Sequence, residues 1–190
     1  MDKLLVQQSI NSIDKNYTRL KRMKKIGLFY SHSTVKTAQI ARKIQQEFAE
    51  NEIDSVNLDE AWEDELKNYE NLILGTSTWF DGELPDHWDE VIPIVNTLDF
   101  KGKKVAVYGL GNQKDYPDNF VDGIGLLAGV FEGNGAEIIG FTSTDGYEFT
   151  SSKAVRTDQF CGLAIDFENQ SSKTDERVKA WVEKLRKEFN

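Results

Sequence analysis

Short β-type apolar runs alternate along the chain with longer segments in which apolar residues recur at helical spacing. The predicted strands cover residues 26–30, 53–58, 71–75, 103–109 and 137–141, and the predicted helices cover 34–49, 85–96, 119–131 and 174–189. Three of the strand runs are nearly continuous in Ile, Leu, Val, Phe and Tyr, as strands buried on both faces require. The alternation predicts an α/β fold in which helices cover both faces of a parallel sheet.

The length of the chain sets the number of domains. With 190 residues, the chain has room for one domain with a sizeable core and hardly for two. A strand begins within three residues of Met23, so we expect one domain over residues 23–190. Residues 1–22 are expected to form a poorly ordered N-terminal extension.

Acidic residues outnumber basic ones. The net charge is −9, and because residues 1–22 hold five Lys or Arg against two Asp, residues 23–190 carry −12. An acidic surface repels nucleic-acid phosphates and suits attraction to a basic protein partner. No apolar run is long enough to span a membrane, and the single cysteine, Cys161, excludes an internal disulfide. We expect a cytoplasmic protein that binds neither nucleic acid nor membranes, with Cys161 as a buried packing residue.

Two predicted strands end in loops that carry an aromatic residue. Trp79 follows the run at 71–75, and Tyr116 follows the run at 103–109. Both loops belong to the carboxyl edge of a parallel sheet, where open α/β folds bind their ligands. A planar side chain in each loop predicts that one planar ring is held between Trp79 and Tyr116.

The first predicted strand is followed by a loop rich in hydroxyl side chains. Its residues are Ser31, His32, Ser33, Thr34, Val35, Lys36 and Thr37. The amides that begin the following helix favour an anion, and a phosphate there would offset the unfavourable position of Lys36 near the positive end of the helix dipole. The alternative is structural, with Thr34 and Thr37 as helix-capping residues and Lys36 as a solvated lysine. The two aromatic loops downstream favour the phosphate site.

Several sequence blocks occur in an order typical of one protein family. The blocks are residues 76–85 and 110–117, then 143–149 and 162–166, then 169–171 and 174–177. Through them the chain resembles the flavodoxins of the long-chain type, from about Met23 to Phe189. The first loop departs from the flavodoxin pattern Ser/Thr-x-Thr-Gly-x-Thr, because His32 stands for a hydroxyl residue and Val35 for the glycine. Valine costs little there if the backbone is helical, and it is strained if the position needs a positive φ.

The resemblance implies the flavodoxin-like fold, a doubly wound parallel sheet of five strands with helices on both faces. An insertion after residue 141 would split the last strand, which residues 159–165 would resume. The resemblance also implies one non-covalently bound FMN. The residues that it places at FMN are Ser31, His32, Ser33, Thr34, Val35, Lys36, Thr37, Ser77, Thr78, Trp79, Phe80, Asp81, Leu110, Gly111, Asn112, Tyr116 and Asn119.

The function that the resemblance implies is that of a low-potential one-electron carrier. Such a flavoprotein shuttles electrons between larger enzymes and is not an independent catalyst. Its partners would be a ferredoxin/flavodoxin-NADP reductase and acceptor oxidoreductases, and it would work as a monomer. Acidic residues near both aromatic loops would lower the potential of the second electron step.

Two other functions stay open at the level of the residues. A small FMN-dependent NAD(P)H or quinone reductase would bind the same cofactor, but no second nucleotide motif supports it. A non-redox binding module on the same scaffold is motivated by His32 and Val35. The sequence shows neither a catalytic arrangement of side chains nor the spacing of a metal site.

Overall fold

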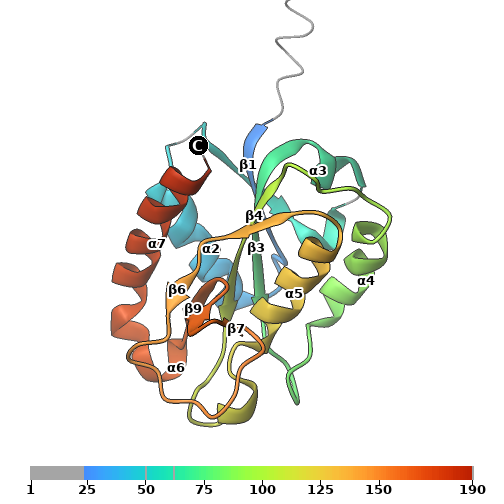
Figure 1. The fold of residues 1–190 in the computed structure, drawn as a ribbon. Coiled ribbons are helices and arrows are strands. Elements are labelled where there is room, and N and C mark those ends of the chain that lie inside the picture. The colour runs from blue at the N-terminus through green and yellow to red at the C-terminus, as the bar shows by residue number, and fades with distance from the viewer. Residues whose placement is uncertain (1–23, 50, 62, 190) are drawn as a thin grey trace, which may run out of the picture.

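A parallel sheet crosses the centre of the structure, with the strand order β2-β1-β3-β4-β5 (Figure 1). The computed structural model describes residues 24–49, 51–61 and 63–189, so the extension expected at 1–22 lies outside the described residues. The strands are β1 (Lys24–Tyr30), β2 (Ile53–Asn57), β3 (Tyr69–Ser77), β4 (Lys104–Leu110) and β5 (Glu137–Ile139). All neighbouring pairs are parallel, which confirms the predicted α/β architecture.

The last strand of the sheet is split, as the resemblance implies. β5 pairs with the start of β4, and β9 (Leu163–Ile165) pairs with its end. The chain between them forms a small antiparallel sheet of β6 (Thr142–Ser143), β8 (Gln159–Phe160) and β7 (Val155–Arg156). We call residues 140–162 the inserted segment.

Only the second half of the strand expected at 159–165 joins the large sheet. Phe160 belongs to β8, and its ring packs 5.3 Å from that of Tyr147 and 5.4 Å from that of Phe149. The amide of Cys161 donates to the carbonyl of Ala154. Aromatic packing of Phe160 therefore keeps Gln159 and Phe160 in the small sheet.

Helices cover both faces of the large sheet. α2 (Val35–Glu47) and α7 (Thr174–Glu188) lie on one face, and α4 (Asp86–Val95) and α5 (Asp122–Gly133) lie on the other (Figure 1). The shorter elements are α3 (Glu63–Lys67), α6 (Phe167–Gln170) and the 3-10 turns η1 (Leu58–Glu60), η2 (Pro117–Asn119) and η3 (Ser171–Lys173). The helix expected from residue 119 begins at Asp122, because η2 comes first and Val121 has a left-handed backbone with φ of 50°.

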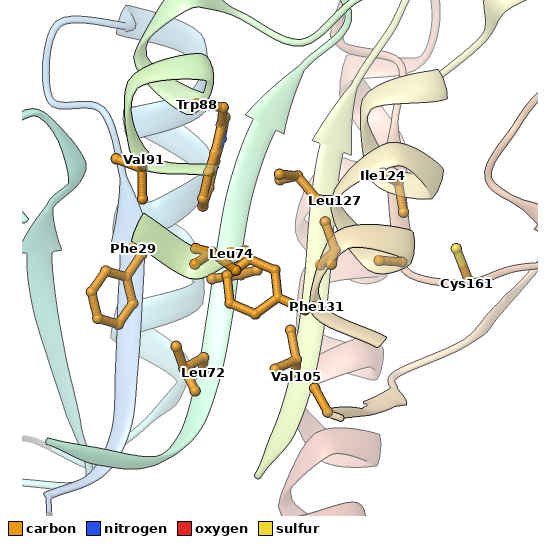
Figure 2. Packing of buried hydrophobic residues seen from close by; sticks show 14 of the residues in the cluster. Phe29, Leu72, Leu74, Trp88, Val91, Val105, Ile124, Leu127, Phe131 and Cys161 are labelled. Carbon is orange, nitrogen blue, oxygen red and sulfur yellow. The ribbon is translucent and has the colours of Figure 1, made fainter. Parts of the chain in front are cut away.

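Two apolar layers hold the helices against the sheet. In the layer drawn in Figure 2, Trp88 of α4 and Phe131 of α5 pack edge to face, with ring centroids 6.4 Å apart. The opposite layer contains Ile40 of α2 and Trp181 of α7, and both are buried. Cys161 is buried in the first layer, which raises the pKa of its thiol and confirms its expected packing role (Figure 2).

A glycine in β3 lets a tyrosine of β4 connect the sheet to α2. Gly75 pairs with Tyr108 across the two strands, and a Cβ at Gly75 would lie 2.2 Å from the Tyr108 hydroxyl oxygen. This hydroxyl donates to the carbonyl of Thr37, 3.1 Å away. Burial raises the pKa of Tyr108, so the hydroxyl stays protonated and remains a donor. The contact fixes the first turn of α2 relative to the carboxyl edge of the sheet.

Replacing Gly75 by Ala should lower the free energy of unfolding by about 2 kcal/mol, because the new methyl group displaces the Tyr108 ring. Urea unfolding measures the change. The matched control is Gly129→Ala in α5, where an added Cβ meets no atom within 4 Å. That substitution should stabilise the helix by up to about 1 kcal/mol. Equal effects at the two positions would show that Gly75 is not needed for the Tyr108 contact.

Candidate functional site

The first loop joins β1 to α2 at the carboxyl edge of the sheet. Thr34 is the N-cap residue of α2, and its hydroxyl donates to the carbonyl of Ser31, 2.8 Å away, instead of capping the helix. The first turn of α2 contains no acidic residue and carries Lys36. The positive end of the helix thus has no anion from its own first turn, a condition that favours binding of an external anion.

Val35 has an unstrained backbone despite its departure from the flavodoxin pattern. It lies in the first turn of α2 and is absent from the residues with positive φ. It is also 77% exposed, so its side chain meets no crowding from the core. A valine in place of glycine therefore costs little at this position.

Ser31, His32 and Ser33 make their contacts on the side of the loop that faces η1 and β1. Ser31 is buried, and its hydroxyl donates to Asp59 Oδ2, 3.0 Å away. The His32 ring packs on that of Tyr30, with centroids 4.8 Å apart. Ser33 is exposed and shares a 2.7 Å hydrogen bond with the Ser31 hydroxyl. These contacts stabilise the loop by connecting it to η1 and β1.

The Trp79 loop, residues 78–85, follows β3 as a tight reverse turn. The amide of Trp79 donates to the carbonyl of Glu83 at 2.9 Å, and the amide of Glu83 donates back at 2.8 Å. Phe80 and Gly82 have left-handed backbones, with φ of 43° and 94°. Glycine adopts this conformation freely, whereas Phe80 holds it at a cost of about 1 kcal/mol. The turn presents Trp79 and Phe80, which are 38% and 73% exposed.

A buried carboxylate, that of Asp122, supports this turn from the interior of the protein. Asp122 accepts from the amide of Lys153 at 2.7 Å and pairs with its ammonium group at 3.1 Å, and the Asp122 side chain is 2% exposed. The same ammonium group donates to the carbonyl of Gly82 at 3.3 Å, and Asn119 donates to the carbonyl of Asp81 at 3.1 Å. A Cβ at Gly82 would lie 2.5 Å from Asp122 Oδ2, so only glycine fits. The inserted segment thereby fixes the backbone of the Trp79 loop.

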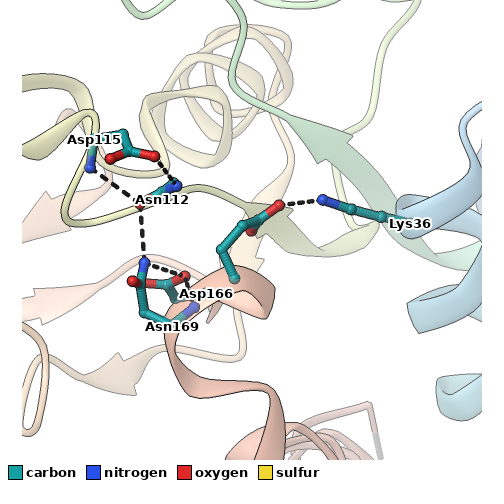
Figure 3. A network of polar contacts seen from close by, with 6 residues as sticks. Lys36, Asn112, Asp115, Asp166 and Asn169 are labelled. Atoms are coloured by element: carbon teal, nitrogen blue, oxygen red, sulfur yellow. Dashed lines mark hydrogen bonds and ion pairs between the residues drawn. The ribbon is translucent and has the colours of Figure 1, made fainter.

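A second buried carboxylate organises the Tyr116 loop, residues 111–117, which follows β4. Asp166 is fully buried and accepts from the amide and the side chain of Gln113, at 3.2 and 2.6 Å. It also accepts from the amide and the side chain of Asn169, each at 3.0 Å (Figure 3). The side-chain oxygen Oε1 of Gln113 accepts from the amide of Glu148 at 2.6 Å. Four N–H donors compensate the buried charge of Asp166 and connect the loop to α6.

Asn112 shapes the tip of the Tyr116 loop. Its side-chain oxygen accepts from the amide of Asp115 at 3.0 Å and from the side chain of Asn169 at 2.9 Å. Its backbone carbonyl accepts from the amide of Tyr116 at 2.9 Å. Figure 3 shows how this network connects Asp166 to the turn, which presents a Tyr116 side chain that is 58% exposed.

Two adjoining clefts open between the three loops. The aromatic pocket has a volume of about 300 Å³ and is lined by Thr78, Trp79, Phe80, Gly111, Asn112, Tyr116 and Asn119. The α2 cleft has a volume of about 400 Å³ and is lined by Thr34, Val35, Lys36, Thr37, Ser77, Thr78, Trp79, Leu110, Gly111, Asn112, Tyr116 and Glu168. Because the two clefts share five lining residues, they extend from the start of α2 to both aromatic side chains.

An ion pair between Lys36 and Glu168 of α6 lies at the α2 cleft (Figure 3). The side chain of Lys36 is 54% exposed and that of Glu168 is 37% exposed, so water screens the pair. Asp81, at the tip of the Trp79 turn, and Asp115 are also exposed.

Among the described residues, no group of three or more His, Cys, Asp or Glu side chains is placed to hold a metal ion. The arrangement is suited to holding an elongated ligand that is anionic at one end and planar at the other.

All but four of the residues expected at FMN line these clefts. The four are Ser31, His32, Ser33 and Asp81. Sequence reasoning missed Asp122, Lys153 and Asp166, which hold the loops from behind, and Glu168, which lines the α2 cleft. Asp166 lies within one of the sequence blocks that support the resemblance, and Glu168 lies beside another. This position was the sequence signal that could have marked both residues as part of the site. Nothing near Lys153 in the sequence marks its contact with the Trp79 loop.

Comparison with known proteins gives a consistent family. The family model described as Flavodoxin matches residues 28–181. A flavodoxin of a Nostoc species is 43% identical over 166 residues, which cover 87% of this chain and 98% of that protein. A flavodoxin of Synechococcus elongatus is 44% identical over 168 residues, which cover 88% of this chain and 99% of that protein.

A solved structure also resembles the chain closely. The crystal structure of Fusobacterium nucleatum flavodoxin bound to flavin mononucleotide matches with a TM-score of 0.83. The two chains are 36% identical, and the match covers 88% of this chain and all of that one. The relatives found by sequence and by fold are therefore proteins of the same kind.

Replacing Asp166 by Ala should lower the free energy of unfolding by about 3 kcal/mol, because four N–H groups lose their buried acceptor. Thermal or urea unfolding measures the loss. The control is Asp145→Ala, an exposed aspartate in the inserted segment, which should change stability by less than about 0.5 kcal/mol. If the two variants were equally stable, Asp166 would not anchor the Tyr116 loop.

Proposed function

The chain belongs to the flavodoxin family, and we propose that it carries electrons one at a time on a non-covalently bound FMN. The observation that carries this proposal is the pair of adjoining clefts between α2 and the aromatic residues Trp79 and Tyr116. One end offers a helix N-terminus with Lys36, and the other offers two exposed aromatic side chains. A phosphate group and a planar ring are the two ends of FMN.

The residues at the α2 end fit a phosphate ester. Thr34 and Thr37 line this end, Thr37 with a hydroxyl group, and the first turn of α2 supplies backbone amides and the positive charge of Lys36. Val35 contributes its backbone, which is helical and unstrained. Ser31, His32 and Ser33 stay in the proposed site as parts of the same loop, with their side chains supporting its shape. The phosphate end is thus held by one short segment of chain.

The residues at the aromatic end fit a planar ring. Trp79 and Tyr116 would cover the ring and exclude water from it, and Phe80 lines the same pocket. Asn112 and Asn119 bring amide groups to the same pocket. The remaining residues of the proposed site lie at the ends of β3 and β4 and in the loops that follow, where their backbone groups are offered to the ring. They are Ser77, Thr78, Asp81, Leu110 and Gly111.

FMN, when bound, supplies the redox chemistry, because its ring takes up and releases electrons singly. The protein sets the potential through the charges and hydrogen bonds that surround the ring. Asp81 and Asp115 are exposed on the two loops that form the pocket. Their carboxylates disfavour a further negative charge there, which supports a low potential for the second electron.

The two alternative functions are not favoured. A flavin-dependent NAD(P)H or quinone reductase would be an enzyme, whereas the relatives matched over nearly their whole length are named flavodoxins. The non-redox module rested on His32 and Val35. The helical backbone of Val35 and the packing of His32 on Tyr30 remove the reason to regard the first loop as degraded.

Redox partners follow from the family, and we propose a ferredoxin/flavodoxin-NADP reductase as donor and acceptor oxidoreductases as recipients. The net charge of −9 supports steering toward partners with basic surfaces. We propose that these partners dock where Trp79 and Tyr116 are exposed. The same charge opposes nucleic-acid binding. We further propose that the protein works as a monomer in the cytoplasm. Within the described ranges, no helix is both long enough and apolar enough to cross a bilayer.

An FMN titration of the purified apoprotein tests the proposed cofactor. Tight one-to-one quenching of flavin fluorescence is expected, because the ring would stack on aromatic side chains. The control is the same titration of heat-unfolded protein, which should leave the fluorescence unchanged. Flavin that stays fully fluorescent with the folded protein would exclude the carrier function.

Trp79→Ala and Tyr116→Ala should each weaken binding of FMN and of riboflavin by at least about tenfold, because both ligands carry the ring. Lys36→Met should weaken FMN alone, by about three- to tenfold, because riboflavin has no phosphate. Dissociation constants from fluorescence titrations give all six values. If Lys36→Met weakened both ligands equally, the phosphate would not lie at the start of α2.

A further inference from the structure

The α2 cleft already contains a carboxylate supplied by the protein itself. Glu168 lines the cleft and pairs with Lys36, although the two residues lie 132 positions apart in the sequence. We propose that Glu168 is a built-in competitor of the cofactor phosphate: it pairs with Lys36 when no phosphate is bound and lowers the affinity for phosphorylated flavin. This inference rests on the proposed function, because it assumes that FMN phosphate binds at the start of α2.

The backbone of Glu168 is fixed close to the cleft. The preceding Asp166 is fully buried and caps α6 by accepting from the amide of Asn169 at 3.0 Å. Phe167 packs against the apolar layer that contains α2 and α7. These contacts hold the first turn of α6 in place, and with it the backbone of Glu168 beside the cleft.

Lys36 is placed where a cation needs an anion beside it. It lies in the first turn of α2, near the positive end of the helix dipole, and that turn contains no acidic residue. Glu168 supplies the negative charge that this turn lacks. The carboxylate therefore takes, with this lysine, the role that a phosphate would take.

A bound phosphate changes the balance between these charges. A phosphate monoester carries about 1.5 to 2 negative charges near neutral pH, more than one carboxylate, so it attracts Lys36 more strongly. Glu168 is then left without its partner and beside a dianion. Because its side chain is 37% exposed, it can turn toward solvent, but the repulsion still opposes binding.

The test is to measure FMN and riboflavin binding to the full chain and to Glu168→Gln, by fluorescence titration at low and at physiological ionic strength. Gln keeps the size of the side chain and removes its charge. We expect about three- to tenfold tighter FMN binding at low ionic strength, a smaller gain at higher salt, and no change for riboflavin. In a Lys36→Met background the gain should be smaller, because part of it comes from releasing the lysine.

Asp175→Asn provides the matched control. Asp175 of α7 also pairs with a lysine of α2, Lys43, at 2.5 Å, but it does not line the α2 cleft. The substitution removes the same charge and should leave FMN affinity nearly unchanged. An equal gain in FMN affinity in Asp175→Asn and Glu168→Gln would show that only the net charge of the protein matters, and it would overturn the inference.

Other outcomes are equally distinct. Unchanged or weaker FMN binding to Glu168→Gln would show that Glu168 does not compete with phosphate. Tighter riboflavin binding to the variant would place the effect at the ring and overturn the inference as well. If none of the proteins, including the unaltered chain, bound FMN, the proposed function would fail and this inference with it.

Discussion

Parallel pairing of β3 with β4 determines where the site forms. The register continues to Ser77 opposite Leu110, and the amide of Thr78 then donates to the carbonyl of Leu110 at 3.1 Å. Both aromatic loops therefore leave the sheet at the same level and open toward one another. The same two strands meet α2 through Tyr108, whose ring occupies the space left by Gly75. One pair of strands thus sets the relative positions of the anion end and the ring end.

Two buried carboxylates hold the loops that this strand pairing brings together. Asp122 fixes the Trp79 loop and Asp166 fixes the Tyr116 loop, each through several hydrogen bonds away from water. Lys153 and the amide of Glu148, both in the inserted segment, take part in the two networks. The inserted segment therefore supports both walls of the aromatic pocket, and neither residue is among those lining it. Loop positions fixed in this way reduce the ordering that a ligand must cause when it binds.

The sequence predicted those parts of the site that depend on local order along the chain. Trp79 and Tyr116 were identified because each follows a recognisable strand and a parallel sheet places strand ends together. Side-chain direction could not be obtained in this way, so Ser31 was expected in the site although its hydroxyl points to Asp59. Lys153 was missed because its role depends on a contact with Gly82, far away in the sequence, and only the folded chain shows that contact. The split of the last strand was foreseen, but the small sheet that separates its halves was not, because short antiparallel pairs leave little periodic signal.

The proposed function requires that this site uses FMN to transfer single electrons. The most direct measurement is a stepwise reduction of the FMN-loaded protein at controlled potential, followed by visible absorption. Two resolved one-electron steps are expected, the second at a lower potential than for free FMN, because Asp81 and Asp115 flank the pocket. A single two-electron step, or steady oxidation of NADPH by the protein alone, would contradict the function of a one-electron carrier.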